Sequence, residues 1–171
     1  MIRDAVPEDA EQIAAIYDYY VNTSTATFEL EPPSAGEMRR RIIDVQKTHL
    51  WIVEEENGKI LGYAYAGQYK ERPAYRFTTE LAVYVDRNHR GKKIGPILTR
   101  AVLERLKGMP YYTAFACITS ENLKSMQMVE ELGFELVGRA HNVGRKFGKW
   151  LGIVDYTLPI KPYPDKIPEE E

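Results

Sequence analysis

The sequence predicts an α/β protein with a mixed, largely antiparallel sheet and helices on both of its faces. Apolar residues recur at helical spacing in two segments, and start and stop residues indicate two further helices. Strand-like segments in the first half follow one another without a helix between them, and an Asn-Gly pair joins two of them. The predicted order β-α-α-β-β-β-α-β-α-β-β differs from a doubly wound parallel sheet, in which a crossover helix separates the strands.

The first elements are a short strand over residues 2–6 and a helix over 7–22. Pro7 suits the first turn of a helix because its missing N–H would have no partner there, and two acidic residues follow it at the positive end of the helix dipole. A polar, β-branched loop continues to residue 33. A serine then provides a cap for a second helix over 34–47.

Three strands are expected in the middle of the chain, over residues 50–55, 59–65 and 77–85. Asn57-Gly58 between the first two is a strong hairpin signal because both residues tolerate a positive φ angle. The third strand is rich in β-branched and aromatic residues.

The second half alternates helices and strands. An amphipathic helix is expected from residue 94 to a Gly-Met-Pro stop at 108–110, and a second helix from Ser120 to Gly133. The strands predicted in this half span residues 111–118, 134–137 and 150–158.

The length of 171 residues indicates one domain, placed over residues 1–158, and composition indicates a loosely ordered Pro- and Glu-rich tail over 159–171. A net charge of −2 gives no reason to expect a nucleic acid or membrane partner. The single cysteine, Cys117, favours a reducing, cytoplasmic setting, and is expected to be a small core residue. The three histidines are too scattered for a metal site, and His89 is expected to face solvent in a turn.

A basic, glycine-containing turn at residues 87–95 follows the strand 77–85 and precedes the helix that starts near Ile94. The first turn of a helix has N–H groups with no internal partner, and glycine allows close approach of a ligand to the backbone. This chemistry suits a phosphate or pyrophosphate. The alternative is a solvated, charged loop, and the turn matches neither a Walker P-loop nor a Rossmann fingerprint.

The turn resembles the acetyl-CoA motif of the GNAT family of N-acetyltransferases, [QR]-x-x-G-x-[GA]. The resemblance implies that the backbone of Val83, Tyr84 and Val85 binds pantetheine. It implies a pyrophosphate site at the turn, formed by Arg90, Gly91, Lys92, Lys93, Ile94 and Gly95. A second segment resembles the family's N-x-x-S…G-F motif and implies that Asn122 and Ser125 contact the cofactor arm, although Asn122 is also a typical helix cap.

Five further segments, at 25–29, 62–66, 72–76, 80–85 and 143–150, resemble the phosphinothricin/methionine sulfoximine acetyltransferase branch of that family. The resemblance covers about residues 1–158. It implies acetylation of the α-amine of a glutamate- or methionine-like compound, with acetyl-CoA as cosubstrate and no metal, and it implies a homodimer. The substrate residues implied are Phe28, Glu29, Arg72, Tyr75 and Arg76.

Glu80 is the candidate general base. An α-ammonium must lose a proton before its nitrogen can attack a thioester, and a carboxylate in a largely apolar strand is unusual. The alternative is a structural salt bridge with an arginine. Arg72 and Arg76 can bind a substrate carboxylate through their guanidinium forks, the alternative being a solvated loop.

Four positions depart from the family pattern. Lys93 replaces a glycine, and a positive φ angle is energetically unfavourable for lysine. Pro96 removes a backbone amide donor. Val129 stands where many relatives have a Tyr or His acid, and Gly152 where the branch has Asp, with Asp155 later. These departures leave open a catalytically silent acyl-CoA-binding domain, and acetylation of protein N-termini or polyamines is a further alternative. Trp150 is expected to pack in the core.

Overall fold

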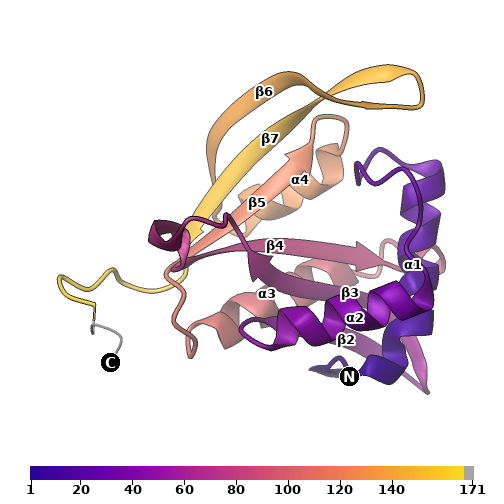
Figure 1. Ribbon diagram of the computed structural model, residues 1–171, viewed down its shortest axis with the longest axis horizontal. Coiled ribbons are helices and arrows are strands. Elements are labelled where there is room, and N and C mark those ends of the chain that lie inside the picture. Colours follow the sequence, from indigo (N-terminus) through magenta and orange to yellow (C-terminus); the bar gives the residue numbers. More distant parts are fainter. Residues whose placement is uncertain (168–171) are drawn as a thin grey trace.

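Seven strands form one sheet in the computed structural model, which describes residues 1–167 (Figure 1). Their order is β1-β2-β3-β4-β5-β7-β6, and β4 and β5 form the parallel pair among antiparallel neighbours. The strands are β1 (Ile2–Asp4), β2 (Leu50–Glu56), β3 (Lys59–Gln68), β4 (Thr78–Val85), β5 (Thr113–Thr119), β6 (Glu135–Lys146) and β7 (Lys149–Pro159). The predicted mixed, largely antiparallel sheet is confirmed.

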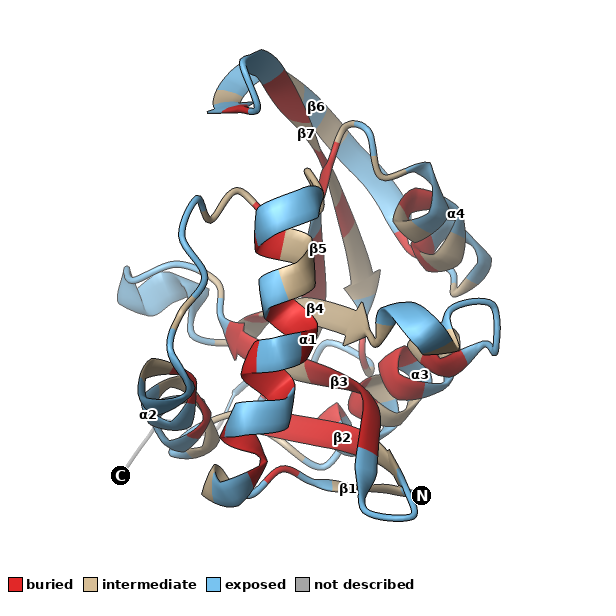
Figure 2. Cartoon of the chain, turned by 90° about the vertical axis from the view of Figure 1, so that its right-hand side faces the viewer, coloured by how far each residue is buried: buried red, intermediate tan, exposed pale blue. Residues whose placement is uncertain are grey.

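Helices cover both faces of the sheet. Buried residues of α1 and α2 pack with one face of β2, β3 and β4, and buried residues of α3 and α4 pack with the other face. Figure 2 shows buried residues of these helices turned toward the sheet and exposed residues turned outward. The α-helices are α1 (Ala10–Thr23), α2 (Ala35–Gln46), α3 (Ile94–Leu106) and α4 (Leu123–Glu131), and the short 3-10 helices are Pro7–Asp9, Pro73–Tyr75 and Arg87–His89. None of the helices in residues 1–167 has the length and apolar character needed to cross a membrane.

Local signals in the sequence explain several of these boundaries. The Ser34 hydroxyl accepts a hydrogen bond from the Glu37 amide at 3.1 Å and caps α2 as predicted. Asn57 and Gly58 have φ angles of 51° and 78° and close the β2–β3 hairpin. The predicted helix over 7–22 begins with a 3-10 turn instead, because the Asp9 carboxylate accepts hydrogen bonds from the Val6 amide and the Arg3 guanidinium.

The prediction for the last strands is wrong in length. β6 runs through Lys146 rather than ending at residue 137, and it joins β7 at Phe147 and Gly148, which both have positive φ angles. Trp150 is 64% exposed on this hairpin, so the expectation that it packs in the core is also wrong. The segment between residues 138 and 146 is polar and glycine-containing. It therefore lacks the apolar alternation that identifies a half-buried strand.

Two further boundaries differ from prediction. α4 begins at Leu123 because Asn122 is its cap, whereas the Ser120 hydroxyl accepts a hydrogen bond from the Gly152 amide at 3.1 Å. The start of the tail is not loose. Ile160 is buried, and the Lys161 ammonium donates a hydrogen bond to the Met109 carbonyl at 2.5 Å. The end of the predicted tail, residues 168–171, lies outside the described residues.

Candidate functional site

A cleft opens where β4 and β5 separate. The two strands pair at three positions, the last being Glu80 with Phe115. Beyond this point β4 pairs with β3 and β5 pairs with β7. The resulting cavity has a volume of about 880 Å³ and is lined by both strands, the start of α3, α4 and the loop at residues 24–26. The edge of β4 over residues 81–85 therefore presents to the cleft backbone groups that no neighbouring strand pairs with, where an extended ligand can bond.

The turn before α3 forms one end of this cleft. Gly91 and Lys93 both have positive φ angles, at 81° and 60°, and α3 begins at Ile94. Lys93 thus takes the left-handed conformation that the family pattern gives to glycine, at a cost of roughly 1 kcal/mol, and it brings a positive charge to the helix N-terminus. The predicted residues that line the cleft here are Arg90, Gly91, Lys93, Ile94 and Gly95, whereas Lys92 does not line it.

Arg90 is held against two aromatic rings at the same end of the cleft. Its guanidinium lies 4.9 Å from the centroid of the Tyr19 ring and 5.2 Å from that of Tyr20. The Tyr20 hydroxyl donates a hydrogen bond to the Val85 carbonyl at 2.5 Å. Sequence reasoning missed a role for the two tyrosines in the site, because helical spacing was their only signal. His89 is half-buried and bonds to the Asp86 carboxylate at 2.9 Å, so the expectation of a solvent-facing histidine is wrong.

The start of α4 forms another wall. The Asn122 side chain accepts a hydrogen bond from the Ser125 amide at 3.3 Å, as expected for a cap, and both residues line the cleft. Val129 also lines the cleft and belongs to the apolar core. It provides no acid for a leaving group at that position.

Glu80 lies on β4 next to the point where the strands separate. Ala82 and Tyr84 share its face, while Leu81, Val83 and Val85 pack with the opposite face, as the alternation predicts. Within residues 1–167 its carboxylate has no ion pair and no hydrogen bond, so the salt-bridge alternative is not observed. Burial raises the pKa of Glu80, and the negative charge of Asp155 raises it further.

Cys117 faces the cleft and is exposed, which corrects the expectation of a core residue. The correction follows from the divergence of β5 from β4, which removes the neighbour that would have covered the thiol. Partial desolvation and the neighbouring Asp155 carboxylate raise the pKa of Cys117 to about 12. The thiol therefore stays protonated at neutral pH and is a poor nucleophile.

The predicted substrate loop follows β3 and carries Arg72, Tyr75 and Arg76. The Tyr75 ring packs edge-on against Tyr69 at 5.5 Å between centroids, and Tyr69 in turn contacts Phe115 at 4.5 Å. Phe115 pairs with Glu80 at the point where β4 and β5 separate, which is the closed end of the cleft. The packed rings of Tyr75, Tyr69 and Phe115 therefore connect the loop to this end. The three predicted residues do not themselves line the cleft.

Phe28 and Glu29 belong to a loop that is fixed by other side chains. Arg41 donates two hydrogen bonds to the Glu29 carboxylate, at 2.6 and 3.0 Å, and its charge keeps the pKa of Glu29 below the usual value. Phe28 packs against Gly144, where an added Cβ would lie 2.4 Å from the ring. The buried Lys146 ammonium donates to the Thr27 carbonyl at 2.9 Å. This network positions the adjoining residues 24–26 over the cleft.

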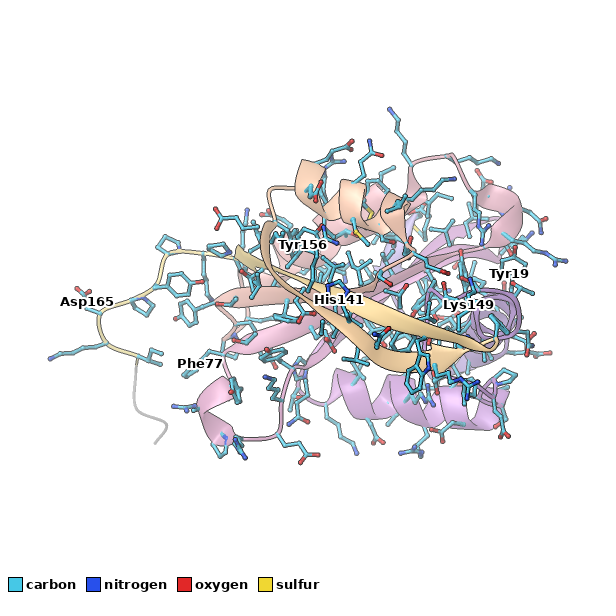
Figure 3. All side chains as sticks on the ribbon, turned by 90° about the horizontal axis from the view of Figure 1, so that it is seen from above. Tyr19, Phe77, His141, Lys149, Tyr156 and Asp165 are labelled. Carbon is cyan, nitrogen blue, oxygen red and sulfur yellow. The ribbon has the colours of Figure 1, made fainter. Side chains whose placement is uncertain are left out.

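The hairpin of β6 and β7 is tied to the mouth of the cleft. Lys149 lies near its tip and His141 midway along β6 (Figure 3). The Lys149 ammonium donates to the Glu121 carboxylate at 2.9 Å, and the same carboxylate accepts from the Thr25 hydroxyl at 2.9 Å. The loop before α4, the loop after α1 and the hairpin therefore meet at one acidic residue.

Comparison with known proteins places this geometry in a family. The model of a family described as an acetyltransferase (GNAT) domain matches residues 2–154. The chain is 37% identical over 171 residues to a phosphinothricin N-acetyltransferase of Alcaligenes faecalis, covering 99% of this chain and 85% of that protein. It is 33% identical to an L-methionine sulfoximine/L-methionine sulfone acetyltransferase of Pseudomonas aeruginosa, covering 94% and 95% of the two chains.

A solved structure shows the same fold. It is a GNAT superfamily phosphinothricin acetyltransferase from Sinorhizobium meliloti in complex with acetyl-CoA, with a TM-score of 0.91 and 33% identity, covering 99% of this chain and 96% of that chain. The family match extends over most of the chain, and the structural match extends over nearly all of it. The chain therefore belongs to the GNAT family of acetyltransferases.

Proposed function

We propose that the chain transfers the acetyl group of acetyl-CoA to the α-amine of a small amino-acid-like substrate of the phosphinothricin or methionine sulfoximine type. One observation carries the proposal. A cleft with an unpaired strand edge and a basic helix N-terminus ends beside a carboxylate that has no partner among the described residues. The named relatives support this class of substrate.

The residues of the cleft fit acetyl-CoA. The backbone of Val83, Tyr84 and Val85 lies on the free edge of β4 and suits the amides of a pantetheine arm. The turn from Arg90 to Gly95 suits the diphosphate, because unpaired amides and positive charge meet there. Asn122 and Ser125 line the opposite wall.

Glu80 is proposed to act as the general base. A proton passes from the substrate ammonium to a Glu80 oxygen, and the freed nitrogen lone pair attacks the thioester carbon. The carbon–sulfur bond then breaks and the electron pair leaves with the sulfur. The nitrogen loses its second proton to solvent to give the neutral amide, and the thiolate takes a proton from solvent. Val129 cannot supply that proton, and Cys117 with a pKa of about 12 is a weaker acid than the thiol it would protonate.

Arg72 is proposed to bind the substrate carboxylate. Arg72→Ala should raise the KM for phosphinothricin by about tenfold or more, the scale of a lost charge-assisted hydrogen bond, and should leave the KM for acetyl-CoA unchanged. Steady-state kinetics with each substrate varied in turn measure both constants. Arg100→Ala removes an exposed arginine from α3 and is the matched control. An Arg72→Ala enzyme with the same KM for phosphinothricin as the unmodified protein would contradict the binding of the substrate carboxylate by Arg72.

We also propose that the protein forms a homodimer through the β6–β7 hairpin. β6 is an edge strand, and large apolar side chains are exposed on the hairpin: Leu136, Val137, Val143, Phe147 and Trp150. Such a patch on a free edge is typical of a protein interface. Trp150→Glu should lower the molar mass measured by light scattering from that of two chains to that of one. A single-chain mass for the unmodified protein would contradict the dimer.

The function itself is tested by acetyl transfer to phosphinothricin, methionine sulfoximine, methionine sulfone, the common amino acids, spermidine and a peptide N-terminus. Turnover of an amino-acid-like amine above that of spermidine and the peptide is the expected result. Heat of binding to acetyl-CoA without turnover of any amine would favour the catalytically silent domain, which the Lys93 and Val129 departures motivate. Absence of any heat of binding at millimolar acetyl-CoA would contradict the proposed function.

A further inference from the structure

Asp155 lies on the same face of the sheet as Glu80. It pairs with Cys117 across β7 and β5, and Glu80 pairs with Phe115 across β4 and β5. Paired residues share a face, as do residues two apart on one strand. Asp155, Cys117, Phe115 and Glu80 therefore point to one side, at the closed end of the cleft.

The polar groups around the two carboxylates are few. Burial chiefly, and the charge of Glu80 next, raises the pKa of Tyr65 on β3, while burial and the charges of Asp155 and Glu80 raise the pKa of Cys117 on β5. The pKa of the exposed Lys70 is raised chiefly by Tyr69 and least by Asp155. Glu29 and Arg41 act on Tyr65 from the α1–α2 side. Neither carboxylate has an ion pair with a residue in the described part of the chain, and Asp155 Oδ1 is buried with no hydrogen-bond partner there.

This arrangement is costly for folding. Two negative groups share a partly desolvated face without a bonded cation, and an unsatisfied buried oxygen costs about 1–3 kcal/mol. Replacing Asp155 by an apolar residue would relieve the cost, so the stability of the fold does not account for the carboxylate. An ammonium ion at the end of the cleft would offset the charge of both groups.

We propose that Asp155 is a positioning residue for Glu80, whose charge strengthens Glu80 as a proton acceptor and draws the ammonium form of the substrate to the closed end of the cleft. The inference rests on the proposed function and adds a second carboxylate to it. The proton still passes from the substrate nitrogen to Glu80, and no bond to Asp155 forms or breaks. The raised pKa of Glu80 agrees with this role, since Asp155 contributes to the shift after burial.

The test is the Asp155→Asn variant, which keeps the shape of the side chain and removes its charge. The acid limb of the kcat/KM profile should move to lower pH because Glu80 loses a like-charged neighbour. The KM for the amine should rise on the order of fivefold, as for loss of one partly screened charge, while the KM for acetyl-CoA stays the same. Asp18→Asn removes an exposed aspartate from α1 and controls for the change in net charge.

An Asp155→Asn enzyme with an unmoved acid limb would overturn the inference, because a purely structural role predicts lower stability without a change in that limb. Asp155→Glu retains the charge and should keep the limb near its original position. In the Glu80→Gln background, Asp155→Asn should have little further effect on turnover if it acts through Glu80. Fully additive losses would contradict that route.

A carboxyl carbon-13 NMR titration of the unmodified protein makes the test independent of the folding of any variant. The Glu80 resonance should titrate above the range of an ordinary glutamate, because burial and the charge of Asp155 both raise its pKa. A Glu80 resonance that titrates in the ordinary range would contradict the effect of that charge. The two proposals fail in different ways. If Glu80 is not the general base, Glu80→Gln keeps normal turnover. If only the role of Asp155 is wrong, Glu80→Gln is inactive and the acid limb of the kcat/KM profile of Asp155→Asn does not move.

Discussion

Glu80→Gln is expected to lower kcat by at least about a hundredfold while leaving acetyl-CoA binding intact, because general bases typically contribute 10²–10⁴-fold. Glutamine has nearly the same shape but cannot accept the ammonium proton. The Glu80 carboxylate has no hydrogen bond or ion pair with any residue from 1 to 167, so the substitution breaks no contact of the fold. Steady-state kinetics with phosphinothricin and calorimetry with acetyl-CoA measure the two effects separately.

The pH dependence gives the same residue a second signature. Glu80 acts when it is ionised, so kcat/KM should rise with pH through its pKa, and burial places that rise above the range of an ordinary glutamate. Glutamine should abolish this limb in whatever activity remains. Glu56→Gln, at an exposed position at the end of β2, is the matched control and should keep both the limb and the rate.

Glu80→Gln should lower activity without lowering the stability of the fold at neutral pH. A carboxylate whose pKa is raised in the folded state binds its proton more tightly there than in the unfolded chain. Its ionisation therefore costs stability as pH rises above the pKa of the unfolded group. Glu80→Gln removes that cost, so its melting temperature at neutral pH should be equal to or above that of the unmodified protein. A fall in both melting temperature and acetyl-CoA affinity would instead identify Glu80 as a structural residue.

The elements that could be predicted are those with local signals. The Asn57-Gly58 turn, the Ser34 cap and the stripe of α3 depend on residues within a few positions of one another. Glu80 was identifiable for a related reason, since one carboxylate interrupts an otherwise apolar and β-branched strand. The turn before α3 gave a recognisable motif because its chemistry lies in one continuous segment.

The elements that could not be predicted depend on strand order. β7 lies between β5 and β6, and this non-sequential position brings Asp155 to the face of Glu80. The separation of β5 from β4 exposes Cys117, although its flanking sequence is apolar. The contact between Lys146 and the Thr27 carbonyl joins residues 119 positions apart. Sequence periodicity relates residues within one helix or strand and therefore does not predict such a contact.

Gly152→Ala is expected to destabilise the fold by about 3 kcal/mol, the upper end of the cost of forcing an extra group into a packed site. A Cβ atom at Gly152 would lie 2.6 Å from the Ala140 carbonyl oxygen, which belongs to the backbone and cannot rotate away. The close approach arises from the irregular pairing of β6 and β7 between Ala140 and Gly144. For a chain of this length the melting temperature should fall by roughly 6–12 °C.

Gly138→Ala is the matched control, because a Cβ at Gly138 has no atom within 4 Å. Its melting temperature should be unchanged or slightly higher, since alanine lowers the conformational entropy of the unfolded chain. Equal losses at the two glycines would show that the loss comes from glycine replacement in general and not from the close approach to Ala140.

The same contact bears on an aspartate at position 152, the residue that the sequence resemblance implies there. Aspartate there would have to place its Cβ against the Ala140 carbonyl and its carboxylate beside the backbone. The Gly152 amide and carbonyl also bond to Ser120, at 3.1 and 3.0 Å, two residues before the Asn122 cap of α4. Gly152→Asp should therefore lower acetyl-CoA affinity as well as stability, because a shift of Ser120 moves the wall of the cleft that Asn122 and Ser125 line. Calorimetry at a temperature where the variant is folded separates the two losses, and an unchanged affinity would show that α4 keeps its position when this pair of hydrogen bonds is strained.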